Sequence, residues 1–201
     1  MDPVNLWLEF LEVAIHNILY HKNIYPKKIF DLKKKYNVPI HVITHEGLNQ
    51  YIANVLNAVN FLTQKDQLEQ VHLQLSDEKG NPSQNYVFNV IRLQNVSQVI
   101  ETSNDPFLVR MENAMQAFLV KTSLTNSEMP PLPENSQFEL VLKLKDCHFV
   151  SNVEDDQTFQ RFQWTGQEER FTPKDSQIIP LENVNTSFMQ VEMYVEHYSP
   201  S

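Results

Sequence analysis

The sequence predicts an α+β fold in which an antiparallel sheet is backed by three helices. Three segments repeat their apolar residues with a helical period, whereas others alternate with the period of two that is typical of strands. The segments do not follow one another in regular βαβ order, which argues against a parallel sheet. At 201 residues, we predict a single domain, 1–201, with a core over about 1–150 and a distinct C-terminal segment over about 151–201.

The first predicted helix begins at Asp2-Pro3, where an N-cap residue precedes a proline at the first helical position. Its apolar residues cover nearly the whole circumference, so we expect it to be mostly buried. These residues are Val4, Trp7, Leu8, Phe10, Leu11, Ala14, Ile15 and Ile18. We expect the helix to end at Pro26, because a proline pushes the residue before it out of the α region. The short apolar segment 40–43, which follows Pro39, is a candidate edge strand.

The second predicted helix has the clearest helical period in the chain. Its apolar positions are Leu48, Tyr51, Ile52, Val55, Leu56, Val59 and Leu62. The period then changes to two over 71–75, and a turn at 77–84 leads to a partner strand at 86–91. These two segments predict a β-hairpin.

The third predicted helix follows Asn104-Asp105-Pro106 and runs to about Ser123. Its apolar stripe is rich in methionine, which is more typical of a core than of a binding surface. The stripe comprises Phe107 or Leu108, Met111, Ala114, Met115, Phe118 and Leu119. The proline-rich segment 127–136 predicts a loop, with docking to an SH3-type groove as the less favoured alternative.

The last third of the chain behaves differently from the rest. A strand is predicted over 138–144 and a returning strand over 158–164. The returning strand carries an aromatic cluster, Phe159, Phe162 and Trp164, and is followed by a polar link, 166–177, and an alternating segment, 187–196. No periodicity joins the two ends of this stretch, so we expect that it does not fold against itself. Our hypothesis is that it closes as a strap over a peptide from another protein.

The net charge is −9, but it is unevenly distributed. The segment 22–35 carries six lysines and one aspartate, a local charge of +5 that leaves −14 for the rest. Binding to phosphates needs an extended positive surface. We therefore interpret Lys33-Lys34-Lys35 as a solvated edge and expect no direct nucleic-acid binding. A DNA-tracking or nuclear-import patch is the alternative.

The sequence offers no motif for catalysis, a cofactor or a metal. It contains no nucleophile elbow, phosphate loop or dinucleotide fingerprint, and its three glycines could hardly build one. His41 and His45 are four residues apart, but Pro39 argues against a helix that would bring them together, so we interpret both as structural. We therefore predict a protein that is not an enzyme and binds no cofactor or metal.

The single cysteine, Cys147, excludes an internal disulfide and fits a reducing compartment. On a strand, the adjacent His148 would point to the opposite face, which argues against a Cys/His dyad. No apolar run approaches the ~18 residues that a membrane span needs. The N-terminus lacks the basic region of a signal peptide. We expect no membrane association.

Several segments of this chain resemble the HORMA-domain family. They are FLEVAIHNILY from Phe10, YPKKIFDLKKKYNVPIHVITHEGLNQYI from Tyr25, IIPL from Ile178 and MQVEMYVE from Met189. Within the family, the resemblance is to the accessory subunits of the translesion DNA polymerase zeta. It implies three helices behind an antiparallel sheet, with a C-terminal "safety belt" over about 151–201.

The resemblance also implies a function in translesion synthesis and the DNA damage response. The belt would pin an extended, proline-containing peptide of the catalytic subunit of DNA polymerase zeta against the sheet. Main-chain hydrogen bonds would supply affinity and side-chain pockets specificity. Tyr51 and Trp164 match the family's aromatic positions that line the peptide channel. Core packing is the alternative role for each of them.

A second surface is implied by Ile178, Glu192 and Tyr194, which match family positions that bind the C-terminal domain of the scaffold polymerase. The alternation of 189–196 independently places Gln190, Glu192, Tyr194 and Glu196 on one face. This chain has Glu192 where the family typically has glutamine, and Ile178 where it has leucine. Glutamine donates and accepts hydrogen bonds, whereas an ionised glutamate only accepts.

Two further expectations concern assembly. Gln116 stands where relatives have an arginine used in HORMA–HORMA dimerisation, which weakens any prediction of self-association. The chain begins close to its first helix, without the longer tail that the AAA+ HORMA remodeller pulls in the family. The implied location is the nucleus, with the cytoplasm as a further site. The alternative function is a conformational-switch HORMA protein of the mitotic checkpoint or the chromosome axis.

Overall fold

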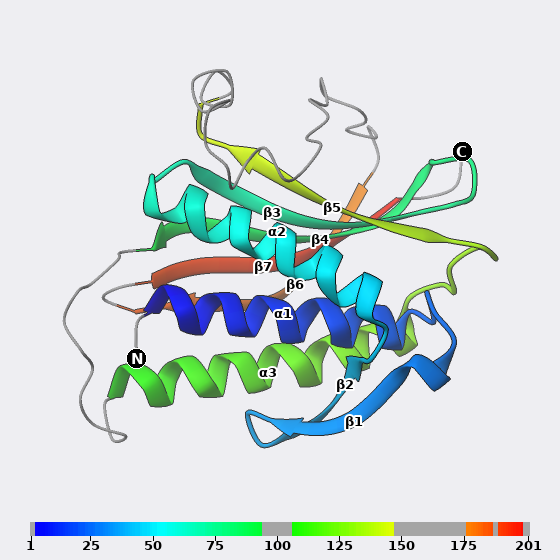
Figure 1. The fold of residues 1–201 in the computed structure, drawn as a ribbon, viewed down its shortest axis with the longest axis horizontal. Helices are drawn as coiled ribbons and strands as arrows, with labels where there is room; N and C mark the ends of the chain where they lie inside the picture. Colours follow the sequence, from blue (N-terminus) through cyan, green and yellow to red (C-terminus); the bar gives the residue numbers. More distant parts are fainter. Residues whose placement is uncertain (1–2, 94–105, 147–175, 187–188, 199–201) are drawn as a thin grey trace.

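A five-stranded antiparallel sheet with helices against one face forms the body of the molecule (Figure 1). The computed structural model describes residues 3–93, 106–146, 176–186 and 189–198, and in this part of the chain there are three α-helices. These are α1 (Pro3–His21), α2 (Glu46–Gln64) and α3 (Pro106–Glu128). In spatial order, the strands are β5 (Gln137–Leu144), β3 (Leu68–Ser76), β4 (Pro82–Leu93), β7 (Met189–Tyr198) and β6 (Ser176–Asn185). The predicted α+β class is confirmed.

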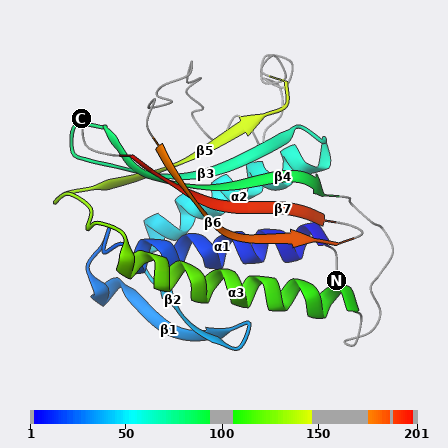
Figure 2. The ribbon, with the colours of Figure 1, turned by 180° about the vertical axis from the view of Figure 1, so that it is seen from behind.

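Helix α1 is buried on nearly every side, as its apolar circumference predicts. It lies between α2 and α3, which contact the sheet themselves, and it also contacts the small hairpin described below (Figures 1 and 2). Its aromatic side chains join these layers. The Phe10 ring meets Phe118 of α3 edge-on at 5.2 Å, and the Trp7 ring meets Phe88 of β4 at 6.0 Å.

The helix ends at His21, before the predicted boundary at Pro26. Asn23 adopts a left-handed backbone with φ 54°, a conformation that asparagine tolerates and that stops a helix.

No helix in the described part of the chain is long and apolar enough to cross a membrane.

A separate two-stranded hairpin covers the helical side of the molecule (Figure 2). Strand β2 (Val38–Ile43) contains the predicted edge segment, but its partner β1 (Phe30–Lys35) was not predicted. The lysine-rich sequence of β1 does not indicate a strand, because only Phe30 among its residues is buried. Lys33 and Lys34 are exposed, whereas Lys35 forms an ion pair with Glu9 of α1. The interpretation of this run as a solvated edge is consistent with these positions.

The second helix and the hairpin are confirmed. Helix α2 buries Ile52, Val55, Val59 and Leu62 as its period predicts. Strands β3 and β4 pair in antiparallel register, and Val71, Leu73 and Leu75 are buried against the helices.

Helix α3 continues to Glu128, past the predicted end at Ser123 and into the segment predicted as a loop. It buries Met111, Met115, Phe118 and Leu119, whereas the side chains of Phe107 and Leu108 lie outside the described residues. The loop itself begins at Met129.

The expectation that the C-terminal stretch cannot fold against itself was wrong. Strand β6 pairs with β7 in antiparallel register from Ser176↔Tyr198 to Asn185↔Gln190. The pairing register shifts between Pro180 and Glu182. The buried residues of β6, Leu181 and Val184, are therefore three positions apart instead of two or four. This shift breaks the alternation by which a strand is found in a sequence. The predicted strand 158–164 lies outside the described residues, as does Cys147.

The buried His16 makes the stability of this fold sensitive to acid. Its Nδ1 accepts a hydrogen bond from the Ile43 N–H at 3.3 Å. Burial, and secondarily the positive charge of Lys33, lowers the pKa of His16 to about 4. The unfolded chain therefore binds this proton more readily than the folded chain between pH 6.5 and 4. Stability is fully present above about pH 6.5 and falls as the pH drops toward 4.

We expect the His16 contribution to the free energy of unfolding to fall by up to about 3 kcal/mol across this window. Urea denaturation at pH 7 and pH 5 would measure the loss. The variant His16→Asn keeps a hydrogen-bond acceptor but removes the titration, so its stability should fall less. An equal loss in both proteins would contradict this role for His16.

Candidate functional site

Strand β5 is an edge of the described sheet, since β3 alone among the described strands pairs with it. At its end, the Lys145 N–H donates toward β3, to the Gln67 carbonyl at 2.9 Å. The Leu140 N–H instead donates to the Tyr51 hydroxyl at 3.2 Å. Because backbone groups alternate along a strand, those of Leu140 and its even-numbered neighbours face away from β3. This is the geometry that lets an extended peptide be added to a sheet.

Three aromatic rings line this edge. The Phe138 ring of β5 packs edge-on against Tyr51 of α2 at 5.7 Å and against Tyr25 at 6.0 Å. All three are half-buried and pack against the core. Burial raises the pKa of Tyr51, although its hydrogen bond to Leu140 opposes the shift. Tyr51 therefore combines core packing with a polar tip at the edge, and its role in a peptide channel stays a prediction.

Sequence reasoning did not single out Tyr25 or Phe138. Phe138 was assigned only to the apolar face of its strand, and Tyr25 only to the boundary set by Pro26. Their meeting with Tyr51 depends on contacts between segments far apart in the chain. An aromatic residue at the start of a predicted strand was the one available signal.

The chain leaves the sheet at one edge and returns to it at the other (Figure 1). It leaves β5 after Leu144 and re-enters at Ser176 of β6, with β3, β4 and β7 lying between the two edges. The intervening residues therefore join opposite edges of the sheet. Trp164, the other predicted channel residue, belongs to them and lies outside the described residues.

The three residues predicted for the second surface lie together. Tyr194 and Glu192 on β7 face Pro180 and Asn183 on β6, and Ile178 lies two pairs further along. With Lys121 of α3, they line a shallow groove of about 390 Å³. Ile178 is 59% exposed, which is unusual for so large an apolar side chain. Burial, and then the nearby Glu196 and Glu192, raises the pKa of Tyr194.

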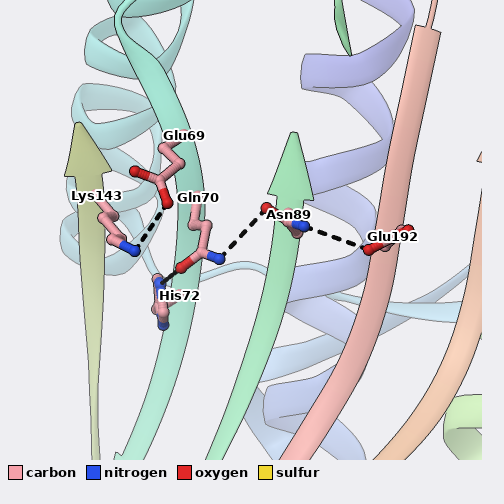
Figure 3. A network of polar contacts seen from close by, with 6 residues as sticks. All are labelled: Glu69, Gln70, His72, Asn89, Lys143 and Glu192. Carbon is pink, nitrogen blue, oxygen red and sulfur yellow. Dashed lines mark hydrogen bonds and ion pairs between the residues drawn. The ribbon is translucent and has the colours of Figure 1, made fainter. Parts of the chain in front are cut away.

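A row of polar contacts fixes Glu192 on this face (Figure 3). Its carboxylate accepts a hydrogen bond from Asn89 Nδ2 at 3.3 Å, and Asn89 Oδ1 in turn accepts from Gln70 Nε2 at 3.3 Å. Gln70 also contacts His72, and Lys143 pairs with Glu69 at 2.8 Å. One carboxylate oxygen of Glu192 is therefore used as an acceptor within the sheet, a role that the carbonyl oxygen of a glutamine could also fill.

Comparison with known proteins assigns the chain to a family. The HORMA domain matches residues 4–188. The chain belongs to the HORMA family. It is 31% identical over 189 residues to the human "mitotic spindle assembly checkpoint protein MAD2B", covering 94% of this chain and 87% of the human protein. It is 27% identical over 192 residues to the Drosophila melanogaster "DNA polymerase zeta subunit 2", covering 94% of each.

Solved structures agree with the HORMA fold. A chain from the "Crystal Structure of Mitotic Checkpoint Complex" superposes with a TM-score of 0.79 at 20% identity and covers 98% of both chains. The C. elegans protein HTP-2, solved bound to the HIM-3 closure motif, superposes with a TM-score of 0.71 at 14% identity. That match covers 98% of this chain and 90% of HTP-2. The predicted HORMA fold is confirmed.

Three further residues were singled out in the sequence: Gln116, His41 and His45. Gln116 is half-buried on α3, and four residues further along lies the partly exposed Val120, so both share one face of the helix. The effect of Gln116 on self-association stays a prediction. His41 stacks on Tyr20 with ring centroids 3.4 Å apart, and His45 caps α2 by accepting from the Leu48 N–H. Both histidines thus have the structural roles that the sequence indicated.

The hydrogen bond from Leu140 to Tyr51 gives a test of the edge geometry. We expect Tyr51→Phe to speed hydrogen exchange of the Leu140 amide about fivefold, which corresponds to roughly 1 kcal/mol for one lost hydrogen bond. Amide exchange followed by NMR would measure this change. The neighbouring amide of Val141 faces β3 and serves as the internal control. Equal protection of Leu140 in both proteins would show that the hydroxyl does not occupy this edge.

Proposed function

We propose that this HORMA protein is a non-catalytic adaptor that traps an extended, proline-containing peptide of the catalytic subunit of DNA polymerase zeta. The observation that carries the proposal is the β5 edge, where Tyr25, Tyr51 and Phe138 line a row of outward-facing backbone groups. The proposed safety belt is the C-terminal segment of about 151–201, which includes the paired strands β6 and β7. It works in the nucleus, in translesion DNA synthesis and the DNA damage response.

The chemistry of the edge suits a proline-containing peptide. An added strand pairs with only every second backbone group of β5, so residues between these points need no N–H and tolerate proline. Aromatic rings offer flat apolar surfaces for the proline rings. Enclosure by a segment joined to both sheet edges chiefly slows dissociation, because the peptide cannot leave until that segment opens.

The relatives support this assignment. The names of the Drosophila melanogaster, Arabidopsis thaliana and Schizosaccharomyces pombe proteins refer to a subunit of DNA polymerase zeta. HTP-2, which shares the fold, was solved with a closure motif bound. Each of these relatives matches over most of this chain.

The β6–β7 groove is the second half of the proposed adaptor. It receives the C-terminal domain of the scaffold translesion polymerase, with Tyr194 and Ile178 as apolar contacts and Glu192 as a fixed acceptor. The groove lies at the opposite end of the sheet from β5. The two partners therefore bind without competing for one surface.

The channel assignment predicts the effect of truncating its aromatic residues. We expect Trp164→Ala and Tyr51→Ala each to weaken capture of the proline-containing segment by about 30-fold, as loss of an interface anchor typically costs roughly 2 kcal/mol. Pull-down followed by titration calorimetry would measure it. Leu32→Ala is the control, because Leu32 is 67% exposed on the β1–β2 hairpin, outside the five-stranded sheet. Unchanged capture by Trp164→Ala would remove that residue from the channel.

The groove assignment predicts a separable effect. We expect Tyr194→Ala to weaken binding of the scaffold polymerase's C-terminal domain by about 30-fold while leaving peptide capture unchanged. Gln190→Ala, a truncation on the same face of β7, is the matched control. Surface plasmon resonance with each partner would separate the two sites. Equal loss of both partners would instead indicate a general structural defect.

A second candidate function is a conformational switch in mitotic checkpoint or chromosome-axis signalling. The observation that favours it is the name of the vertebrate relatives, which refers to the mitotic spindle assembly checkpoint. A switch needs two stable states of the free chain that a ligand redistributes. Two slowly exchanging species on ion exchange, together with no capture of the polymerase segment, would favour this function over the adaptor.

A further inference from the structure

A second cavity lies next to the start of β5. It has a volume of about 800 Å³ and is lined by the end of α1 and by the loop that joins α3 to β5. Both views show these two segments side by side (Figures 1 and 2). The loop contributes Pro130, Pro131 and Pro133 to the lining, and the other wall contributes Lys22, Tyr25 and Lys27. The volume is large enough for a few amino-acid residues.

Lys22 is the unusual member of this lining. Its side chain is only 9% exposed, yet among the described residues its ammonium group has no carboxylate partner. Its hydrogen-bond acceptor is the thioether sulfur of Met129 at 3.9 Å, which is a weak acceptor. Burial lowers the pKa of Lys22 to about 8. A buried ammonium without an anion is costly, so the folded chain places a charge here at the expense of stability.

The other charges around the cavity do not supply the missing anion. His21 and Lys27 add positive or neutral groups, and Glu134 is an exposed acid at the loop end of the lining. Lys27 is already engaged, since it donates to the Tyr20 carbonyl and lies 3.4 Å from the centroid of the Tyr20 ring. The carboxyl end of α1 offers at most about half a negative charge to Lys22. The cavity therefore favours an anionic occupant.

The cavity is continuous with the β5 edge. Tyr25 belongs to the cavity lining and also packs on Phe138, the second residue of β5. Ser136 lines the cavity and is followed directly by Gln137, the first residue of the strand. An extended peptide added along β5 would therefore pass from the aromatic row into the cavity without a turn.

We propose that the cavity receives an acidic side chain of the captured peptide, whose carboxylate pairs with the Lys22 ammonium. This inference rests on the proposed function, because it takes the occupant to be the peptide at the β5 edge. The acidic residue flanks the proline-containing core at the end that passes Gln137. Lys22 thus selects among peptides that the aromatic row alone would accept.

The test is a double-mutant cycle on the whole chain. The probes are synthetic peptides with one proline-containing core and either glutamate or glutamine as the flanking residue, placed at the N-terminal or the C-terminal side. We expect wild type to bind the glutamate form about tenfold more tightly than the glutamine form at one of these ends, which is a coupling of about 1.4 kcal/mol. Lys22→Met should bind both forms equally. Lys28→Met, which removes an exposed lysine outside the cavity lining, should keep the preference.

Denaturant unfolding distinguishes a binding role of Lys22 from a structural role. Because no ion pair is lost, Lys22→Met should unfold at the same or a higher denaturant concentration than wild type at pH 7. A clearly lower midpoint would indicate that Lys22 serves the fold and would overturn the proposal.

The binding results test the acidic pocket separately from peptide capture. If wild type binds glutamate and glutamine forms equally at both ends, the acidic pocket is refuted while peptide capture stands. A glutamate preference that persists in Lys22→Met also refutes it. If wild type binds none of the peptides, the proposed function itself fails.

Discussion

The enclosure of α1 is the constraint on which the rest of the structure depends. Trp7 and Phe10 reach the sheet and α3 from this one helix, and each fully buried side chain of this kind stabilises the fold by about 1.5–3 kcal/mol. Both other helices and the β1–β2 hairpin contact α1, and Trp7 joins it to Phe88 of the sheet. The two edge strands add to this core through Leu140 of β5 and through Leu181 and Val184 of β6. Their outer sides are the edges of the described sheet, and the proposed adaptor function uses both of them.

Much of the helical framework and the first hairpin could be predicted because their periods are uninterrupted. The seven apolar positions of α2 and the strict alternation of β3 each describe one buried face. Strand β1 could not be found this way, since it is exposed on nearly every residue and owes its conformation to pairing with β2. Strand β6 was missed for another reason. Its bulge after Pro180 shifts the buried face, so no single period describes it.

The candidate site was predictable only in part, and for a related reason. The alternation of β7 placed Glu192 and Tyr194 on one face, and the structure joins them with Ile178 through the β6–β7 pairing. The aromatic row is different, because Tyr25 and Phe138 meet only in the tertiary structure. The unpaired charge of Lys22 is likewise invisible in a sequence, where it is one of six lysines in a basic segment. Whether this lysine is solvated or buried depends on the tertiary structure.

The bulge at Pro180 has a consequence for assembly. A sheet with two regular edges could accept a strand at each, and chains linked in this way could extend into open-ended polymers. On β6, proline lacks the N–H that a further strand would need, and the bulge bends the edge beside it. Strand β5 contains no proline. The β6 edge is therefore less able than the β5 edge to pair with a further strand, which disfavours open-ended polymers built from this sheet.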